Sequence, residues 1–299
     1  MLSGSRHIVK WAAILLCVLA FSCKKDEQEP PKPVTYEVEV TDFSTMRGSL
    51  KIGGKLYMPK GLEGKKPAVI RCHGLTGSYK DTEVYAKAAA KTGVVACCFD
   101  FCGGHEGSSL SDGDRVHDSV LTEVEDLSAV YDAMANRPDI DPSRIMVMGG
   151  SQGGLVAALY AAENPSKPLA LGLLFPAFNI PSLVRTFTFL YGGLDNIGDT
   201  VTLMGFTVWR QYAVDAYNIF PYKVIGAYEG PVIIIHGTKD ILVPLSNSED
   251  AVKEYKDATL IVLEDQPHGF DKEGQDKAIE YLLGFIDEVL GRKKPKSRP

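Results

Sequence analysis

The fold is decided by residues 145–154, which read IMVMGGSQGG. Four apolar residues lead there into a G-x-S-x-G pattern, and a helical stretch over 155–163 follows it. Such a tight strand-to-helix turn forces its serine into a strained conformation, so only residues without bulk fit around it. We expect the Ser151 hydroxyl to project clear of the sheet and the N–H of Gln152 to face developing negative charge. A glycine-rich turn that holds a serine by chance is the alternative.

The segments on both sides of this turn alternate between short apolar runs and amphipathic stretches. The runs expected to be strands are 68–71, 94–99, 145–148, 169–175, 232–235 and 260–263. The stretches expected to be helices are 82–91, 119–136, 155–163, 246–255 and 277–290. Apolar strands without polar alternation, followed by helices, indicate a parallel sheet that is covered on both faces. Residues 36–40 and 49–58 alternate in polarity instead, which predicts antiparallel edge strands joined by hairpins.

Residues 176–230 interrupt this alternation between two strands that should be consecutive. The segment is far longer than the usual connection, so it must carry structure of its own. It is dense in aromatic residues, most of which we expect to pack the segment onto the body of the protein. We interpret it as an inserted lid beside the active site, within a domain that spans 34–290.

Serine alone is a poor nucleophile, so a base and a group that orients the base must follow at other strand ends. Asp240 comes shortly after the run 232–235, and His268 follows the last run, 260–263. The order serine, aspartate, histidine, with each residue after a strand, is that of the α/β-hydrolase fold. We therefore predict this fold, a mostly parallel sheet flanked by helices, with Ser151, Asp240 and His268 as the catalytic residues.

Other histidines and acids compete for these roles. His73 lies too early in the chain to be the base and is expected to stabilise the loop that presents the Leu75 N–H. His236 ends a strand and is interpreted as structural. Glu264 and Asp265 directly precede the base, so they reach around its imidazole less easily than Asp240, although the sequence leaves them open.

Five motifs resemble those of bacterial feruloyl (cinnamoyl) esterases. They are HGLTG at 73–77, FDF at 99–101, GSQGG at 150–154, HGTKD at 236–240 and HGF at 268–270. The similarity covers nearly the whole chain after Pro33 and keeps the order and spacing of the motifs. It differs in the loop 102–107, which is a residue longer, and in the insertion, which matches weakly.

This resemblance implies roles for individual residues. Ser151, Asp240 and His268 would form the catalytic triad, and the N–H groups of Leu75 and Gln152 would bind the oxyanion. In these esterases the lid recognises the aromatic acyl group.

The expected reaction is acyl transfer in two steps through an acyl-enzyme, with no metal or cofactor. The expected substrates are feruloyl, cinnamoyl or other small acyl esters of plant polysaccharide. Within the insertion, Asp195 or Asp199 is expected to accept the hydroxyl group of a phenolic acyl group. Trp209 is a further candidate for substrate binding.

Two other functions compete with an esterase. Acylpeptide hydrolases and aminopeptidases share this triad but usually carry a large propeller domain, for which this chain has no room. The other alternative is a surface lipoprotein that binds glycans or partner proteins on an inactive hydrolase scaffold. The presence of all three triad residues argues against a binding protein, because binding needs none of them.

The N-terminus has the pattern of an export signal. Arg6 and Lys10 precede the apolar run 11–21, which is too short to span a bilayer stably. Residues 20–23, AFSC, resemble a loose bacterial lipobox that ends at Cys23. An ordinary signal peptide whose cysteine is incidental is the alternative.

Residues 24–27, KKDE, resemble the charged signal that sends some Bacteroidetes lipoproteins to the cell surface. We therefore expect a signal peptide over 1–22, a lipid on Cys23 and a proline-rich tether over 23–33. The lipid would anchor the exported protein to the bacterial outer membrane or the cell surface.

The composition fits this interpretation. The 299 residues carry a net charge of −6, and no basic cluster interrupts the folded part, which argues against nucleic acid as a partner. The segment 291–299, which is rich in Lys and Arg, is expected to form a solvated tail. The cysteines at 72, 97, 98 and 102 lack the paired spacing with histidines that zinc needs, and we expect buried free thiols.

Overall fold

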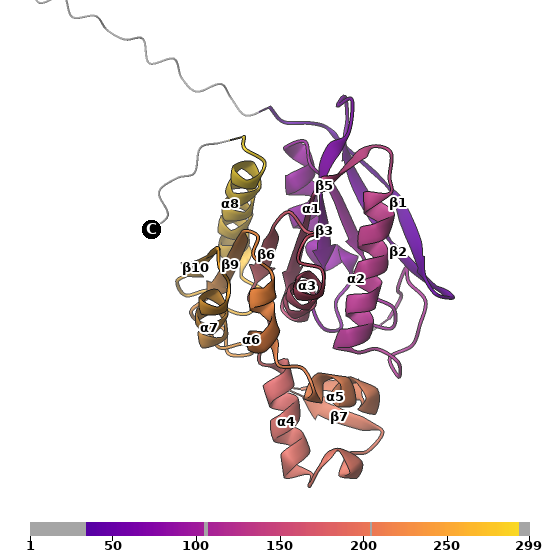
Figure 1. Ribbon diagram of the computed structural model, residues 1–299, viewed down its shortest axis with the longest axis vertical. Coiled ribbons are helices and arrows are strands. Elements are labelled where there is room, and N and C mark those ends of the chain that lie inside the picture. Colours follow the sequence, from indigo (N-terminus) through magenta and orange to yellow (C-terminus); the bar gives the residue numbers. More distant parts are fainter. Residues whose placement is uncertain (1–33, 105–106, 204, 293–299) are drawn as a thin grey trace, which may run out of the picture. The chain divides into compact units, whose positions relative to one another are not determined.

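The computed structural model describes residues 34–104, 107–203 and 205–292 (Figure 1). The predicted signal peptide (1–22), the tether (23–33) with Cys23, and residues 293–299 of the predicted tail lie outside the described residues. The signal peptide, the lipid on Cys23 and the tether therefore stay predictions. Within the described part, no helix is long and apolar enough to cross a membrane.

An eight-stranded sheet organises the described chain. In spatial order its strands are β1 (Val38–Arg47), β2 (Leu50–Pro59), β4 (Val95–Phe99), β3 (Lys66–Cys72), β5 (Ile140–Gly150), β6 (Leu171–Leu174), β9 (Val232–Gly237) and β10 (Ala258–Leu263). The pairs β1–β2 and β2–β4 are antiparallel, and every later pair is parallel. The prediction of a mostly parallel sheet is thus confirmed.

One detail of the sheet differs from expectation. Of the two strands expected at an edge, only β1 lies there, because β2 continues the sheet by pairing with β4; β10 forms the opposite edge. A Cβ atom on Gly54 would lie 2.3 Å from the carbonyl oxygen of Cys98. The glycine therefore lets β2 come alongside β4, which places β2 inside the sheet.

Helices cover both faces of the sheet (Figure 1). On one face lie α1 (Tyr79–Lys91) and α8 (Lys272–Val289), and on the other α2 (Val120–Ala135), α3 (Gln152–Glu163) and α7 (Ser246–Glu254). Successive residues of a strand point to opposite faces, so Val69 packs with α1 and α8 while Ile70 packs with α2 and α3. Burial on both faces explains why the strand sequences are continuously apolar.

The four thiols of the described chain, Cys72, Cys97, Cys98 and Cys102, are buried and free, as expected from the sequence. Burial is the main cause that raises their pKa, to about 12 for Cys98 and for Cys102. They therefore behave as small apolar side chains of the core.

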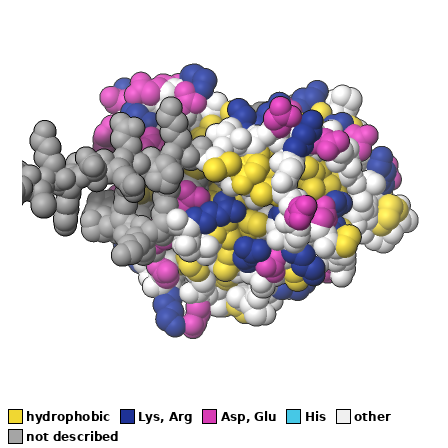
Figure 2. Space-filling view, turned by 90° about the horizontal axis from the view of Figure 1, so that it is seen from above, with side chains coloured by type: hydrophobic (Ala, Val, Ile, Leu, Met, Phe, Trp, Pro, Cys, Tyr) yellow, Lys and Arg dark blue, Asp and Glu magenta, His cyan; other side chains and the backbone are white. Residues whose placement is uncertain are grey.

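Charged side chains of both signs lie on the surface of the protein. In the view of Figure 2, hydrophobic side chains occupy the centre of the visible face, and Lys or Arg side chains alternate with Asp or Glu side chains around them. The two signs are mixed on the uncovered part of this face, in keeping with a modest net charge of −6.

Residues 176–230, between β6 and β9, carry several elements of their own (Figure 1). They are α4 (Ile180–Leu190), a 3₁₀ turn (Leu194–Asn196), β7 (Thr200–Leu203), β8 (Phe206–Trp209), α5 (Arg210–Tyr217), α6 (Pro221–Val224) and a second 3₁₀ turn (Ile225–Ala227). Strands β7 and β8 pair only with each other, as a separate antiparallel hairpin. Phe178, Tyr212 and Tyr228 are buried, whereas Phe189 and Tyr191 are exposed.

The turn between β5 and α3 depends on close backbone contacts. A Cβ atom on Gly149 would lie 2.0 Å from the carbonyl oxygen of Gly153, and one on Gly153 would lie 2.3 Å from that of His73. Both distances are far inside van der Waals contact with backbone atoms, which cannot rotate away. The two glycines are therefore what allows β5, α3 and the loop after β3 to meet.

A glycine-to-alanine pair tests this constraint. Gly149→Ala is expected to lower the free energy of unfolding by at least about 1–3 kcal/mol, the usual cost of overpacking. The matched control is Gly284→Ala in α8, where a Cβ atom meets no heavy atom within 4 Å. That variant should gain up to about 1 kcal/mol from helix propensity. Urea unfolding of both variants checks the prediction, and equal stabilities would contradict it.

Candidate active site

Ser151 lies in the turn between β5 and α3 with φ +53° and ψ −122°. A positive φ is strained for any residue with a side chain and costs about 1–3 kcal/mol. Hydrogen bonds hold the turn in place: the Ser151 N–H donates to the Leu174 carbonyl at 2.9 Å, and the Ala177 N–H donates to the Ser151 carbonyl at 2.9 Å. Strand β6 and the residues after it thus fix the position of the serine.

His268, in the loop after β10, connects the serine to an acid. Its Nε2 lies 3.0 Å from Ser151 Oγ, and its Nδ1 lies 2.6 Å from Asp240 Oδ2. A carboxylate only accepts, so Nδ1 donates to Asp240 and Nε2 is left to accept the serine O–H. The ring of Phe175 packs edge-on against the imidazole at 4.8 Å between centroids, which fixes its orientation.

Asp240 is 7% exposed and is held as a carboxylate by several donors. The N–H groups of Leu242 and Val243 donate to Oδ1 at 3.0 and 2.8 Å, and His236 Nε2 lies 3.2 Å from Oδ2. Burial by itself would raise the pKa of Asp240, but the hydrogen bonds from His236, His268 and Val243 outweigh it and hold the pKa well below its usual value. The residue therefore keeps its charge beside the imidazole.

The rival acids make other contacts. Glu264 Oε2 lies 3.4 Å from the Thr238 hydroxyl, and Asp265 pairs with Lys239 at 3.0 Å; both acids are exposed. Neither acid is hydrogen-bonded to His268 in the described chain, so the geometry favours Asp240.

The other histidines hold the backbone around the site. His73 Nδ1 donates to the Gly74 carbonyl at 2.8 Å, and its Nε2 accepts the Phe101 N–H at 3.1 Å. His236 joins Ser248 to the Val243 carbonyl. Both side chains are buried, and each fixes a loop at the carboxyl end of a strand, as the sequence suggested.

Two backbone N–H groups flank Ser151. Leu75 follows Gly74, whose Cα carries no side chain; a Cβ atom there would lie 3.2 Å from Ser151 Cβ. Gln152 is the first residue of α3. Among the described residues, neither the Leu75 N–H nor the Gln152 N–H donates to a backbone or side-chain acceptor. Both donors are therefore available to a bound group.

The side chain of Gln152 connects the helix α3 to the insertion. Its Oε1 accepts the Tyr212 hydroxyl at 2.6 Å, and both side chains are buried.

Close by, burial and then the charge of Asp126 raise the pKa of Asp118 to about 7. The Ser119 hydroxyl donates to Asp215 at 2.6 Å, which makes a second contact between the body and the insertion.

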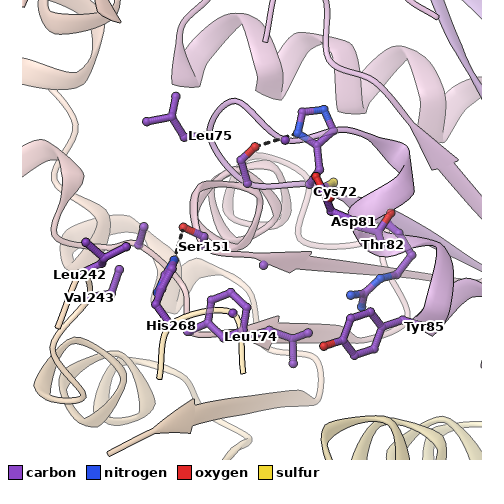
Figure 3. A pocket seen from close by; sticks show the side chains of 18 of the residues that line it. Cys72, Leu75, Asp81, Thr82, Tyr85, Ser151, Leu174, Leu242, Val243 and His268 are labelled. Atoms are coloured by element: carbon purple, nitrogen blue, oxygen red, sulfur yellow. Dashed lines mark hydrogen bonds between the residues drawn. The ribbon is translucent and has the colours of Figure 1, made fainter. Parts of the chain in front are cut away.

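A cavity of about 280 Å³ opens at Ser151 and His268 (Figure 3). Its walls are mostly apolar and come from the loop after β3, from α1, from β6 and from the loops after β9 and β10. The insertion contributes Ala177, Ile180 and Phe206. In Figure 3, Leu242 and Val243 lie at one end and Tyr85 at the other, with Ser151 between them.

Three residues predicted to bind substrate are not among those that line this cavity. Asp195 and Asp199 are exposed on the insertion, in the 3₁₀ turn after α4 and just before β7. Trp209 is half-buried at the end of β8 and also lies outside the cavity lining. The insertion brings other residues, Ile180 and Phe206, to the cavity, and Asp195 and Asp199 remain in solvent. No group of three or more His, Cys, Asp or Glu residues in the described ranges is arranged to hold a metal ion.

Comparisons with known proteins agree with this geometry. A family model described as serine aminopeptidase, S33, matches residues 63–202. The structure of Est1E from Butyrivibrio proteoclasticus superposes with a TM-score of 0.73 at 26% identity, covering 84% of this chain and 99% of Est1E. The form of Est1E with bound ferulic acid superposes equally well, at 27% identity over 82% of this chain and all of Est1E.

The chain is an α/β-hydrolase. The hydrolase resembles feruloyl esterases, as its motifs predicted. It also matches the acylamino-acid-releasing enzyme of Arabidopsis thaliana, at 26% identity over 52% of this chain and 21% of that protein. An α/β-hydrolase domain-containing protein of the same plant, WAV2, is 31% identical over 49% of the chain and 45% of its own length. The hydrolase thus spans less than half of either curated relative.

Among the polar residues of the cavity that the sequence interpretation missed, Arg71 is the one buried charge. Arg71 is the last residue of the predicted strand 68–71 and lines the cavity from inside the sheet. The available signal was an arginine in an otherwise apolar strand, where a charged side chain is rare. Phe175, with φ +36°, was likewise assigned only to a strand, although it contacts the imidazole.

The strain at Ser151 gives a test that does not depend on activity. Alanine and glycine both remove the hydroxyl, but only glycine adopts a positive φ without a steric cost. Ser151→Gly is therefore expected to be more stable than Ser151→Ala, by about 1 kcal/mol after the greater chain entropy of glycine is subtracted. Thermal unfolding of the two variants measures the difference, and a less stable glycine variant would refute the assignment of strain.

Proposed function

We propose that the hydrolase is a serine carboxylic-ester hydrolase that works through an acyl-enzyme. The observation that carries the proposal is the hydrogen-bonded chain from Asp240 through His268 to Ser151, which opens on a cavity. In this arrangement a base reaches the nucleophile at 3.0 Å and is itself oriented at 2.6 Å. Both distances lie in the range needed for proton transfer and for fixing a tautomer.

In the first step, His268 Nε2 takes the proton of Ser151 as Oγ attacks the ester carbonyl. The carbonyl oxygen becomes an oxyanion, and the Leu75 and Gln152 N–H groups donate to it. One such donor contributes about 10²–10³ to turnover in serine hydrolases. The protonated imidazole then delivers its proton to the departing alcohol, which leaves Ser151 acylated.

In the second step, water attacks the acyl-enzyme with the same groups in the same roles. His268 removes a proton from water, and the acid product leaves as Ser151 is reprotonated. Asp240 stays ionised throughout because its low pKa keeps the proton on the imidazole. Its task is to hold the Nδ1–H tautomer and to stabilise the imidazolium that forms in each step.

The substrates proposed are feruloyl or cinnamoyl-type esters, or other small acyl esters, of plant polysaccharide. The support is the resemblance to Est1E over most of both chains, together with the bound ferulic acid in that protein. The mostly apolar cavity, with Phe206 and Phe175 among its walls, suits a planar apolar group beside the serine. The insertion acts as a lid in this proposal, because Ala177, Ile180 and Phe206 cover the cavity from its side.

A serine peptidase is the second candidate function. The matching family model is described as a serine aminopeptidase, and an acylamino-acid-releasing enzyme is among the relatives. Esters and amides are cleaved by the same triad chemistry, so activity on the two leaving groups separates the candidates.

Hydrolysis of a small panel tests the proposed function. The panel contains methyl ferulate, p-nitrophenyl acetate, p-nitrophenyl butyrate and an amino-acid p-nitroanilide. We expect ester cleavage that falls by about 10³ or more in Ser151→Ala, because the nucleophile is lost. Cleavage of the anilide without cleavage of any ester would favour the peptidase function over the esterase function. If none of the four substrates is cleaved, both proposed functions are wrong.

The assignment of the acid is tested by a pair of variants. Asp240→Asn is expected to lower kcat by up to about 10⁴, because the imidazole loses the partner that fixes its tautomer. Asp265→Asn, an exposed acid three residues before the base, is the matched control and should stay within about twofold, as surface substitutions usually do. Steady-state rates on p-nitrophenyl acetate measure both. A larger loss of kcat in Asp265→Asn than in Asp240→Asn would show that Asp265, and not Asp240, orients the imidazole.

A further inference from the structure

Arg71 is a charged residue in the middle of the protein. It is the sixth of the seven residues of β3 and shares the face of Val69, which packs against α1 and α8. The residue is 1% exposed and is the largest of the fully buried side chains in the described chain. A guanidinium keeps its charge in proteins, so this face of the sheet contains a buried cation.

The cation lacks an anionic partner among the described residues. Its Nε and Nη1 atoms have no hydrogen-bond acceptor, and no carboxylate forms an ion pair with it. Burial accordingly lowers the pKa of Arg71. The one favourable contact is with the ring of Tyr85, 4.6 Å from the guanidinium carbon. A cation–π contact of this kind offsets only part of the cost of burying a charge, which is several kcal/mol.

A half-buried arginine elsewhere in the described chain is paired with carboxylates. Arg47 is the comparable case, and its guanidinium contacts the buried carboxylate of Asp126 as well as Glu125. Within the described ranges, Arg71 differs from Arg47 in having no carboxylate partner. An unpaired buried charge is costly, which favours the binding of a counter-ion from outside the described chain.

The guanidinium lines the same cavity as Ser151 and His268. Around it are Tyr85, Thr82 and Gln275, which bring polar groups to the cavity wall. The nearest carboxylate in the lining, Asp81, is exposed and accepts the Ser78 N–H at 2.7 Å as part of the cap of α1. The cavity therefore has a reactive centre with the serine and a cationic end with an unused fork of donors.

We propose that Arg71 binds a carboxylate of the substrate, so that the natural ester carries a negative charge at one end. The inference rests on the proposed esterase function and narrows its substrate class. Figure 3 supports the arrangement: Tyr85, which stacks with Arg71, lies across the pocket from Leu242 and Val243, and Ser151 lies between. A substrate held at its charged end by Arg71 would place its ester bond at the serine.

A planar carboxylate suits the site because guanidinium donates two parallel hydrogen bonds to it. An apolar stem between the carboxylate and the ester suits the walls made by Leu174 and Phe175. The anion would replace the missing counter-charge, so binding would also stabilise the fold. A neutral ester of the same length would leave the guanidinium unpaired.

Matched pairs of substrates test the proposal whichever half of the ester carries the charge. In one set the acyl group carries the charge. The p-nitrophenyl monoesters of succinate, glutarate and adipate are compared with the neutral p-nitrophenyl esters of butyrate, valerate and hexanoate, which have acyl chains of similar length. In the other the alcohol is charged: 4-acetoxybenzoate is compared with its methyl ester. The readout is the ratio of kcat/KM for the charged and the neutral member, which does not depend on how much of a variant is folded.

The wild-type hydrolase should prefer the charged member of at least one pair by about 10- to 100-fold, the contribution of a charge-assisted hydrogen bond. In Arg71→Met the ratio should fall to about one, and in Arg71→Lys part of the preference should survive, since lysine keeps the charge but not the fork. Arg144→Met, which removes an equal charge near the start of β5, is the matched control and should leave the ratio unchanged.

Thermal unfolding gives a second readout that separates binding from structure. If Arg71 is a binding residue, Arg71→Met removes an uncompensated charge and should melt at a higher temperature than the wild type. A lower melting temperature together with an unchanged ratio would assign Arg71 a structural role and overturn the proposal.

Two further results would also overturn it. One is a wild-type enzyme that cleaves the neutral esters and shows no preference in any pair, which leaves the esterase function standing. The other is an enzyme that cleaves none of the esters, in which case the proposed function fails as well.

Discussion

The contact of backbone on backbone beneath Ser151 is the constraint on which the rest of the site depends. Gly149 and Gly153 approach so closely that a Cβ atom on the first would lie 2.0 Å from the carbonyl oxygen of the second. This approach lets β5 turn sharply into α3 and forces Ser151 to φ +53°. The hydroxyl then stands at the edge of the sheet, where a base from another strand can reach it.

The parallel sheet brings His268, the proposed base, to that position. The carboxyl ends of parallel strands meet at one edge, so the loops after β5, β9 and β10 bring together residues that are far apart in the sequence. Asp240 and His268 are separated by 28 residues and His268 and Ser151 by 117, yet all three are joined by hydrogen bonds. The insertion follows β6 at the same edge and contacts the site directly, through the Ala177 N–H at the Ser151 carbonyl and the Tyr212 hydroxyl at Gln152. In the proposed function the three residues supply the chemistry and the lining of the insertion sets the substrate.

Much of this could be predicted because it follows from local patterns. Apolar runs and glycine spacing predicted the sheet and the turn. Asp240 was favoured over Glu264 and Asp265 because these two acids directly precede His268 and reach around its imidazole less easily. The lining of the insertion could not be predicted, because packing decides which side chains face inward: Asp195 and Asp199 lie in solvent while Phe206 lines the cavity. In the sequence Arg71 is an arginine at the end of an otherwise apolar strand, and the structure adds that it has no counter-ion among the described residues.

The central claim is that Ser151 is a nucleophile activated by His268. A fluorophosphonate forms a stable bond only with such a serine, and the intact mass of the protein then rises by one adduct. We predict a single adduct that maps by peptide mass spectrometry to the segment containing Ser151, with no adduct in Ser151→Ala or after denaturation. An unmodified wild-type protein, or an adduct on another residue, would contradict the account.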